Sequence, residues 1–263
     1  MSNKQPSYRA MNPILKLLQI IYSIYAILLF VLLMLFFFPF VVLASFFGKI
    51  KGGNFIYRLC SYWSDIWFFM IGIYAKSVAE TPYDITQQYI FVANHISYMD
   101  VPMIVKVIRQ PVRALGKAEI SKVPVFGFLY RNAVVMVDRS NADNRAKSVI
   151  TLKSVVKKGI SIFIFPEGTF NMEGAPLKEF YDGAFKIAIE TQTPLKPVIF
   201  PDTLDRLHHN SVFSFTPGKC RAIFLDSVPV EGLTVNDVQQ LKANVFARME
   251  EGLKKYVNMM PDI

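Results

Sequence analysis

A run of 31 residues without a charged side chain, from Leu17 to Phe47, limits what this chain can fold into. A membrane-spanning helix needs about 20 apolar residues. A straight helix over this run would be about 46 Å long, whereas the hydrocarbon core of a bilayer is about 30 Å thick. The sequence therefore predicts a membrane-embedded helix over 17–47. That helix is tilted, partly interfacial, or bent at Pro39, which lacks a backbone donor.

A second apolar segment, 61–75, is rich in aromatic residues and contains one acidic residue, Asp65. Trp63, Trp67 and Tyr74 suit the headgroup layer of a membrane. This composition predicts an interfacial helix or the return arm of a helical hairpin, and an ordinary buried helix is the alternative. Residues 1–80 are thus expected to form a membrane anchor, and residues 81–263 a separate globular domain.

The net charge of the chain limits the kinds of partner that it is expected to bind. Lys and Arg total 29 against 20 Asp and Glu, a net charge of +9, which suits nucleic acid or an anionic membrane surface. The apolar N-terminus favours the membrane, and the sequence has no zinc-finger or RNA-binding signature, so we expect no nucleic-acid partner. Cys60 and Cys220 lie far apart and outside any CxxC pattern, which indicates two reduced thiols. Without HExxH or a Cys/His cluster, we expect no metal and no cofactor.

From about residue 85, short β-rich runs alternate with helical patterns. This alternation predicts an α/β domain with a mainly parallel central sheet flanked by helices and preceded by the membrane-embedded helical segment. Thr234 and Asp237 form a possible capping box for the last helix. The expected strands are 89–93, 134–137, 161–165, 197–200 and 222–225, and the expected helices are 101–109, 142–158, 184–190 and 234–256.

The stretch FVANHISYMD places His95 and Asp100 directly after the first of these strands. Functional groups in open α/β sheets tend to follow the carboxyl ends of strands. A turn between the two residues would bring the carboxylate onto the imidazole, fix its tautomer and leave the other ring nitrogen to take a proton. No GxSxG sequence supplies a serine nucleophile, so the substrate's own hydroxyl would have to attack. A packed histidine near a helix-terminal aspartate is the structural alternative.

Two further segments carry polar residues that could belong to a site. PEGTF, 166–170, follows strand 161–165 and presents an acid, a backbone N–H and a hydroxyl, although a plain polar turn is the alternative. Segment 116–129 is expected to be a loop, shaped by Pro124 and Gly127, in which Lys117 and Lys122 offer contacts to anions. A solvated basic loop is the alternative there.

Together these segments resemble the glycerolipid acyltransferase family, specifically the lysophosphatidic acid acyltransferases. NHISYMD, 94–100, carries the family's His-x4-Asp pattern, and FPEGT, 165–169, matches the third conserved block. The segment 117–127 and the proline-framed PLKPV, 194–198, look like the second and fourth blocks, and YDGAF, 181–185, is similar to a run that members often carry. The resemblance covers about residues 89–200.

The resemblance implies that residues 81–263 form an acyltransferase catalytic domain. A fatty acyl group would move from acyl-CoA or acyl carrier protein to the hydroxyl of a lyso-lipid. The first candidate for that lyso-lipid is 1-acyl-glycerol-3-phosphate, which would give phosphatidic acid. His95 would be the general base and Asp100 would orient it. The domain would lie on the cytoplasmic face of the inner membrane. The substrate-binding residues implied are Lys117, Arg139, Glu167, Gly168 and Thr169.

One residue departs from the family's pattern. The third block usually continues with an arginine that contacts phosphate, but position 170 is phenylalanine. Lys117, Arg113 or Arg139 could supply the charge instead. Alternatively, the acceptor is the lyso form of an amino-acid lipid. Two other functions stay open at this point: a non-catalytic lipid-binding scaffold, and a hydrolase that uses His95 to activate water.

Overall fold

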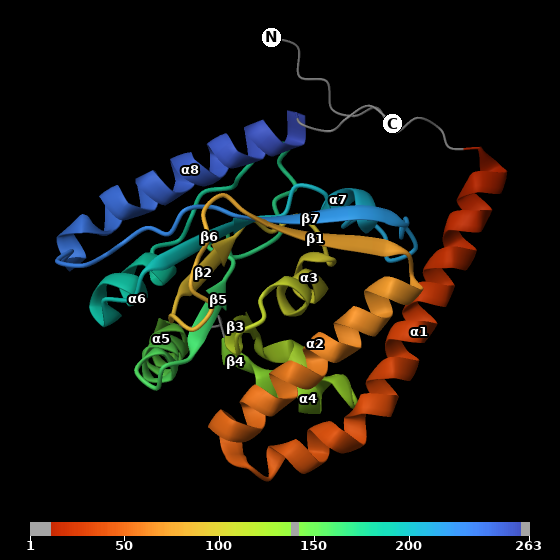
Figure 1. Cartoon of the computed structure of the whole chain (residues 1–263), viewed down its shortest axis with the longest axis horizontal. Helices are drawn as coiled ribbons and strands as arrows, with labels where there is room; N and C mark the ends of the chain where they lie inside the picture. The colour runs from red at the N-terminus through yellow and green to blue at the C-terminus, as the bar shows by residue number, and fades with distance from the viewer. Residues whose placement is uncertain (1–11, 138–141, 259–263) are drawn as a thin grey trace.

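The β-rich runs form one seven-stranded sheet in the computed structural model, which describes residues 12–137 and 142–258 (Figure 1). The strand order is β1-β7-β6-β2-β5-β3-β4, and neighbouring strands run parallel except for β6 and β7. The predicted α/β fold with a mainly parallel sheet is confirmed. The strands are β1 Ile73–Ala79, β2 Ile90–Ala93, β3 Val112–Lys117, β4 Val134–Val137, β5 Ser161–Ile164, β6 Leu195–Ile199 and β7 Gly218–Phe224.

Helices cover both faces of this sheet (Figure 1). The four helices expected in the globular part are present as α3, α5, α6 and α8. The capping box of Thr234 and Asp237 is also present, at a 3-10 turn that leads into α8. The helices are α1 Pro13–Ser45, α2 Gly53–Met70, α3 Asp100–Val107, α4 Phe126–Ala133, α5 Ala142–Val156, α6 Gly183–Thr191, α7 Thr203–Arg206 and α8 Val238–Asn258.

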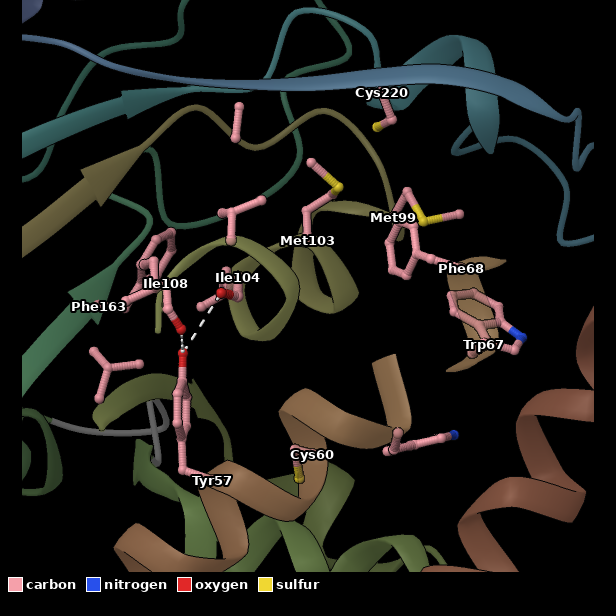
Figure 2. Packing of buried hydrophobic residues seen from close by; sticks show 14 of the residues in the cluster. Tyr57, Cys60, Trp67, Phe68, Met99, Met103, Ile104, Ile108, Phe163 and Cys220 are labelled. Carbon is pink, nitrogen blue, oxygen red and sulfur yellow. Dashed lines mark hydrogen bonds between the residues drawn. The ribbon is translucent and has the colours of Figure 1, made fainter. Parts of the chain in front are cut away.

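Successive residues of the central strands enter two different apolar cores. Phe91 on β2 and Phe163 on β5 join the cluster that lies against α1, α2 and α3, while Ile90 and Val92 join the cluster under α5, α6 and α8. Figure 2 shows the first cluster, in which the Tyr57 hydroxyl of α2 donates to the carbonyl of Ile108, 2.9 Å away. The alternation follows from the two-residue period of a strand. Both faces of the sheet are therefore buried, as expected of parallel strands.

The charge-free run forms one continuous helix, α1, which passes through Pro39 without a break. Among the described residues, α1 is the one helix long and apolar enough to cross a membrane. A π-helical turn at Gly48–Gly52 reverses the chain, and α2 returns along α1 (Figure 1). Trp67 of α2 donates its indole N–H to the carbonyl of Ala26, 2.9 Å away. The two helices form the predicted hairpin.

The bounds predicted for the second apolar segment, 61–75, were wrong. The helix begins earlier, at Gly53, and ends at Met70, and the chain then enters β1. Trp63 and Trp67, which were expected at the headgroup layer, are instead buried, and both rings contact Phe30 of α1. Short apolar runs do not distinguish helix from strand by periodicity, which is why β1 was missed.

The segment 116–129, expected to be a loop, consists mostly of regular structure. It contains the end of β3, a 3-10 turn at Ala118–Lys122 and the start of α4. Gly127 is required at the start of α4, because a Cβ there would lie 2.2 Å from the carbonyl oxygen of Ser121. Proline and glycine thus mark a tight join between a turn and a helix rather than an open loop.

The edge strand β1 pairs with β7 along its whole length, from Ile73 with Gly218 to Ala79 with Phe224. These two strands run opposite to the other five. The division of the chain at residue 80 stays a prediction, but a strand of the sheet lies on its N-terminal side. The hairpin is therefore tied directly to the edge of the sheet.

Candidate functional site

The catalytic candidates lie where β2 leaves the sheet. Asn94 is buried and bridges to Phe200, accepting from its N–H at 2.8 Å and donating to its carbonyl at 3.2 Å. This pair of bonds joins the ends of β2 and β6. The next residue, His95, therefore starts from a fixed point at the carboxyl edge of the sheet, where functional groups of such sheets usually lie.

His95 and Asp100 are brought together as the sequence predicted. His95 Nδ1 lies 2.8 Å from Asp100 Oδ2, and Asp100 is the first residue of α3. The same oxygen accepts from the N–H groups of Ile96 and Ser97, at 2.8 and 2.9 Å. Asp100 is fully buried, whereas the His95 side chain stays 16% exposed. The imidazole is thus oriented through Nδ1, and Nε2 is the nitrogen left to face a substrate.

Aromatic rings enclose the imidazole of His95. The Phe165 ring is stacked on it, with centroids 3.8 Å apart, and the Phe170 ring lies at 4.3 Å with a tilt of 59°. Phe170 in turn contacts Tyr98, whose side chain is 49% exposed. These contacts restrict rotation of the imidazole and give it an apolar border. Position 170 is thus an aromatic wall of the site.

Glu167 is buried beneath the turn that carries His95. Its Oε1 accepts from the N–H of His95 and its Oε2 from the N–H of Lys178, both at 2.8 Å. The N–H of Asn171 also donates to the carbonyl of His95, at 2.7 Å. Burial raises the pKa of the Glu167 carboxyl to about 7, although the hydrogen bonds from the amides of Lys178 and His95 lower that pKa. The carboxylate binds the backbone of His95, which points to a positioning role rather than direct contact with substrate.

The variant Glu167→Gln is expected to change how stability depends on pH. Because the folded pKa of about 7 is above the usual 4.5, the carboxyl's stabilising contribution is fully present below about pH 4.5 and is lost as pH rises through about 7. The Tm of the wild type in detergent should therefore contain a component that falls between about pH 4.5 and 7. The variant should lack this component. Equal pH slopes of Tm for both proteins would contradict this account of Glu167.

Gly168 and Thr169 complete the PEGT turn. Gly168 has φ of +73°, a left-handed conformation that favours glycine, and its N–H donates to the carbonyl of Phe165 at 3.0 Å. Thr169 is exposed. The turn thus presents the Thr169 side chain to solvent, next to Phe170 in the aromatic border of the site.

The basic candidates differ in where the structure places them. Lys117 ends β3 and is exposed, and Arg139 lies outside the described residues. The interpretation of Arg113 as a substrate contact was wrong. Its buried guanidinium donates to the carbonyls of Lys49 and Ile50 and to the side chain of Asn54, because the start of β3 lies under the N-terminus of α2.

Sequence reasoning missed several residues that shape the site. Asn171 and Lys178 act through backbone N–H groups, which any residue type supplies, so no sequence signal could have found them. Phe165 could have been found as the last residue of a β-rich run that directly precedes PEGT. Within the described ranges, no group of three His, Cys, Asp or Glu side chains could hold a metal ion.

Comparison with known proteins places this site in a family. The sequence profile of the Acyltransferase family matches residues 75–201, which contain both turns. The 1-acyl-sn-glycerol-3-phosphate acyltransferases of Salmonella typhimurium and Haemophilus influenzae are 32% and 30% identical over 167 residues. Each of these two matches covers 62% of this chain. They cover 65% of the Salmonella protein and 67% of the Haemophilus protein. The human enzyme of that name, form alpha, is 30% identical, with 61% of this chain and 56% of the relative covered.

A solved structure shares the fold. The crystal structure of the 1-acyl-sn-glycerophosphate acyltransferase PlsC from Thermotoga maritima has a TM-score of 0.74 to this chain, at 23% identity. The structural match covers 96% of this chain and 100% of the Thermotoga maritima chain. The chain belongs to the acyltransferase family. Within that family, the relatives given above carry the name 1-acyl-sn-glycerol-3-phosphate acyltransferase.

Proposed function

We propose that this protein transfers a fatty acyl group from an acyl thioester to the free hydroxyl of a lyso-lipid at a membrane surface. The observation that carries the proposal is the pairing of His95 with the buried Asp100 through Nδ1. This pairing leaves Nε2 for a proton at the carboxyl edge of the sheet. The partial exposure of His95 gives a substrate access to that nitrogen, and the aromatic border suits lipid.

In the proposed reaction His95 Nε2 takes the proton of the acceptor hydroxyl as its oxygen attacks the thioester carbonyl. The new C–O bond forms, the tetrahedral intermediate collapses, and the C–S bond breaks. The imidazolium then returns the proton to the departing thiolate. Asp100 stabilises the imidazolium throughout, since its carboxylate lies 2.8 Å from Nδ1. No acyl-enzyme is needed, because the lipid hydroxyl is itself the nucleophile.

The acceptor we propose is 1-acyl-glycerol-3-phosphate, with phosphatidic acid as product. The named relatives support this choice, and exposed Lys117 at the end of β3 is a candidate contact for the phosphate. Arg139, Gly168 and Thr169 remain candidate contacts as well. The donor is acyl-CoA or acyl carrier protein, both anionic, and the net charge of +9 favours either.

A lyso amino-acid lipid is a second candidate acceptor, and Phe170 favours it. The Phe170 ring lies against His95 and offers no hydrogen bond to phosphate. The first test gives purified protein in detergent a labelled long-chain acyl-CoA with lysophosphatidate and a lyso amino-acid lipid in separate reactions. Transfer to lysophosphatidate supports the main proposal, and transfer only to the amino-acid lipid replaces it. Release of free fatty acid at the same rate without acceptor would indicate a hydrolase instead, and lipid binding without turnover would indicate a scaffold.

The variant Phe170→Arg is expected to lower KM for lysophosphatidate about tenfold, since a hydrogen bond to a charged group contributes on the order of 1.5–3 kcal/mol. The stacking of Phe165 on the imidazole does not depend on residue 170. Initial rates at varied acceptor concentration measure the effect, with Phe170→Leu as the control that removes the ring without adding charge. An unchanged KM in the arginine variant would mean that the phosphate does not reach position 170.

We also propose that the domain faces the cytoplasm from the inner membrane, with α1 in the bilayer. Lys16 lies near the N-terminus of α1, and α2 returns to the same part of α1, since the Tyr25 hydroxyl donates to the carbonyl of Met70 at 3.0 Å. The chain can therefore enter and leave the bilayer on one face, which Lys16 marks as the basic side. A reporter fused at the N-terminus tests this, because external exposure of the reporter would contradict a hairpin that dips.

A further inference from the structure

The loop that follows α7, residues 207–215, connects α1 to the catalytic turn, residues 95–100. On one side, the Gln19 side chain of α1 donates to the carbonyl of Ser214 at 3.1 Å, and the N–H of Phe215 donates to the Ser23 hydroxyl at 3.1 Å. On the other side, the Ser97 hydroxyl donates to the carbonyl of Leu207. Ser97 lies two residues beyond His95, so this loop bridges the apolar helix and the site.

A histidine of the loop makes a second contact with the catalytic turn. His209 Nδ1 lies 3.3 Å from the carbonyl oxygen of Ile96, the residue after His95. The loop also has its own internal bonds, since the Ser214 hydroxyl accepts from the N–H of His208 at 2.8 Å and donates to the carbonyl of Ser211 at 2.6 Å. The loop is therefore tied at both ends and braced internally.

The tip of this braced loop is apolar and exposed. Val212 and Phe213 are 46% and 47% exposed, although Phe215, two residues on, is 5% exposed and packs on Trp67. Exposed apolar residues that adjoin a larger apolar surface often mark an interaction site. The larger surface here is the outer face of α1, on which Leu17, Leu18, Ile21 and Ile24 are 44–58% exposed.

The charges around the tip suit an anionic lipid surface. Lys16 in the first turn of α1 and Lys219 at the start of β7 are exposed, and Arg206 is the last residue of α7, directly before the loop. Gln19, which binds the loop, is about 5 Å along the helix from Lys16. Amphipathic elements lie about 5–10 Å below the headgroup boundary. The loop tip is thus held at interfacial depth if Lys16 marks the headgroups.

We propose that Val212 and Phe213 insert into the same bilayer as α1, so that the 207–215 loop holds the catalytic turn against the lipid surface. The two side chains would contact an anionic bilayer at the boundary between its headgroups and its acyl chains. The proposal rests on the membrane placement of α1 given under the proposed function. It adds a second lipid contact, next to the site.

Lipid-depth quenching of a fluorophore tests the insertion. The full chain carries a single added cysteine labelled with bimane, as Val212→Cys or Phe213→Cys, and the native Cys60 and Cys220 stay in place because both are buried. The protein is reconstituted in vesicles of phosphatidylcholine and phosphatidylglycerol that contain doxyl-labelled lipid. Leu28→Cys reports on α1, where the side chain is 57% exposed.

A matched control lies on the other side of the molecule. Val235, a valine of similar exposure at 58%, lies in the 3-10 turn directly before α8, and Figure 1 shows α8 apart from α1. We expect bimane at positions 212 and 213 to be quenched as strongly as at 28, and bimane at 235 to stay unquenched. Quenching at 28 but not at 212 or 213 would overturn the loop proposal alone. An unquenched label at 28 would overturn the membrane placement of α1 and the loop proposal with it.

A kinetic test separates docking from a merely structural role of the loop. The variant Phe213→Ser is expected to lower kcat/KM at least about tenfold for acceptor in vesicles, because it removes most of the apolar area of the tip. The rate with a short-chain acceptor dissolved as monomer should be unchanged, and Phe213→Leu should restore the vesicle rate. An equal loss with both acceptors would contradict lipid docking and indicate damage to the turn.

Discussion

Replacing His95 with alanine is expected to lower kcat for acyl transfer by about 10²–10⁴-fold, the usual contribution of a positioned general base. The reason is the geometry at Nδ1, which is bound to Asp100 at 2.8 Å and thereby commits Nε2 to the substrate proton. Without the imidazole, no described group at this edge of the sheet replaces that base. Initial rates of phosphatidate formation from labelled acyl-CoA in detergent measure the loss.

The folded state should survive this change, because His95 is partly exposed and its backbone bonds to Glu167 and Asn171 do not need the side chain. Tm and membrane association should stay close to those of the wild type. His208→Asn is the matched control, since it removes a half-buried imidazole whose Nδ1 accepts from the N–H of Asn210. A His95→Ala protein with the wild-type rate would refute the proposed chemistry.

The variant Asp100→Asn is expected to lower kcat by about 10³–10⁴-fold with little change in KM, as removal of the orienting carboxylate does in Ser-His-Asp sites. Asp100 Oδ1 has no hydrogen-bond partner among the described residues. An asparagine can therefore place its amide nitrogen there and keep its oxygen in contact with His95 and the N–H groups of Ile96 and Ser97. The charge is removed while the turn is kept, so kcat should fall more than stability. The kcat and KM are measured with both substrates varied.

Asp202→Asn is the matched control for burial. Asp202 is also buried, but its carboxylate pairs with Arg221 at 2.6 Å rather than with a histidine. Breaking a buried ion pair costs on the order of 3–5 kcal/mol of stability. This control should lower Tm clearly and leave kcat of the folded enzyme nearly unchanged. If Asp100→Asn lowered Tm as much as Asp202→Asn does and lowered kcat as little, Asp100 would have a packing role rather than a role in catalysis.

The catalytic pair could be predicted from the sequence because it is local. His95 and Asp100 lie five residues apart, between a strand and the first turn of a helix, so one turn is enough to join them. Most strands and helices after residue 85 were predictable because strand and helix periodicities differ, but β3 and α4 were not predicted. Edge strand β1 was not, because its apolar run follows α2 without a break in pattern.

The support under the site could not be predicted, because it depends on contacts between distant residues. Glu167 was expected at the substrate, yet its two oxygens bind the amides of His95 and Lys178. Arg113 was a candidate for a phosphate contact, yet its position on β3 places it beneath α2, where backbone carbonyls surround it. Residue type and spacing do not reveal which buried amide or carbonyl a side chain will meet.

The pairing of β1 with β7 has a consequence for the synthesis of this protein. About 145 residues separate Ile73 from Gly218, so at about 5–20 residues per second the ribosome needs on the order of ten seconds to deliver the partner strand. The α1–α2 hairpin can reach the membrane during that time, while the edge of β1 stays unpaired. An unpaired strand edge is a template for other chains. Conditions that slow translation between these strands should therefore increase aggregation of nascent chains at the membrane.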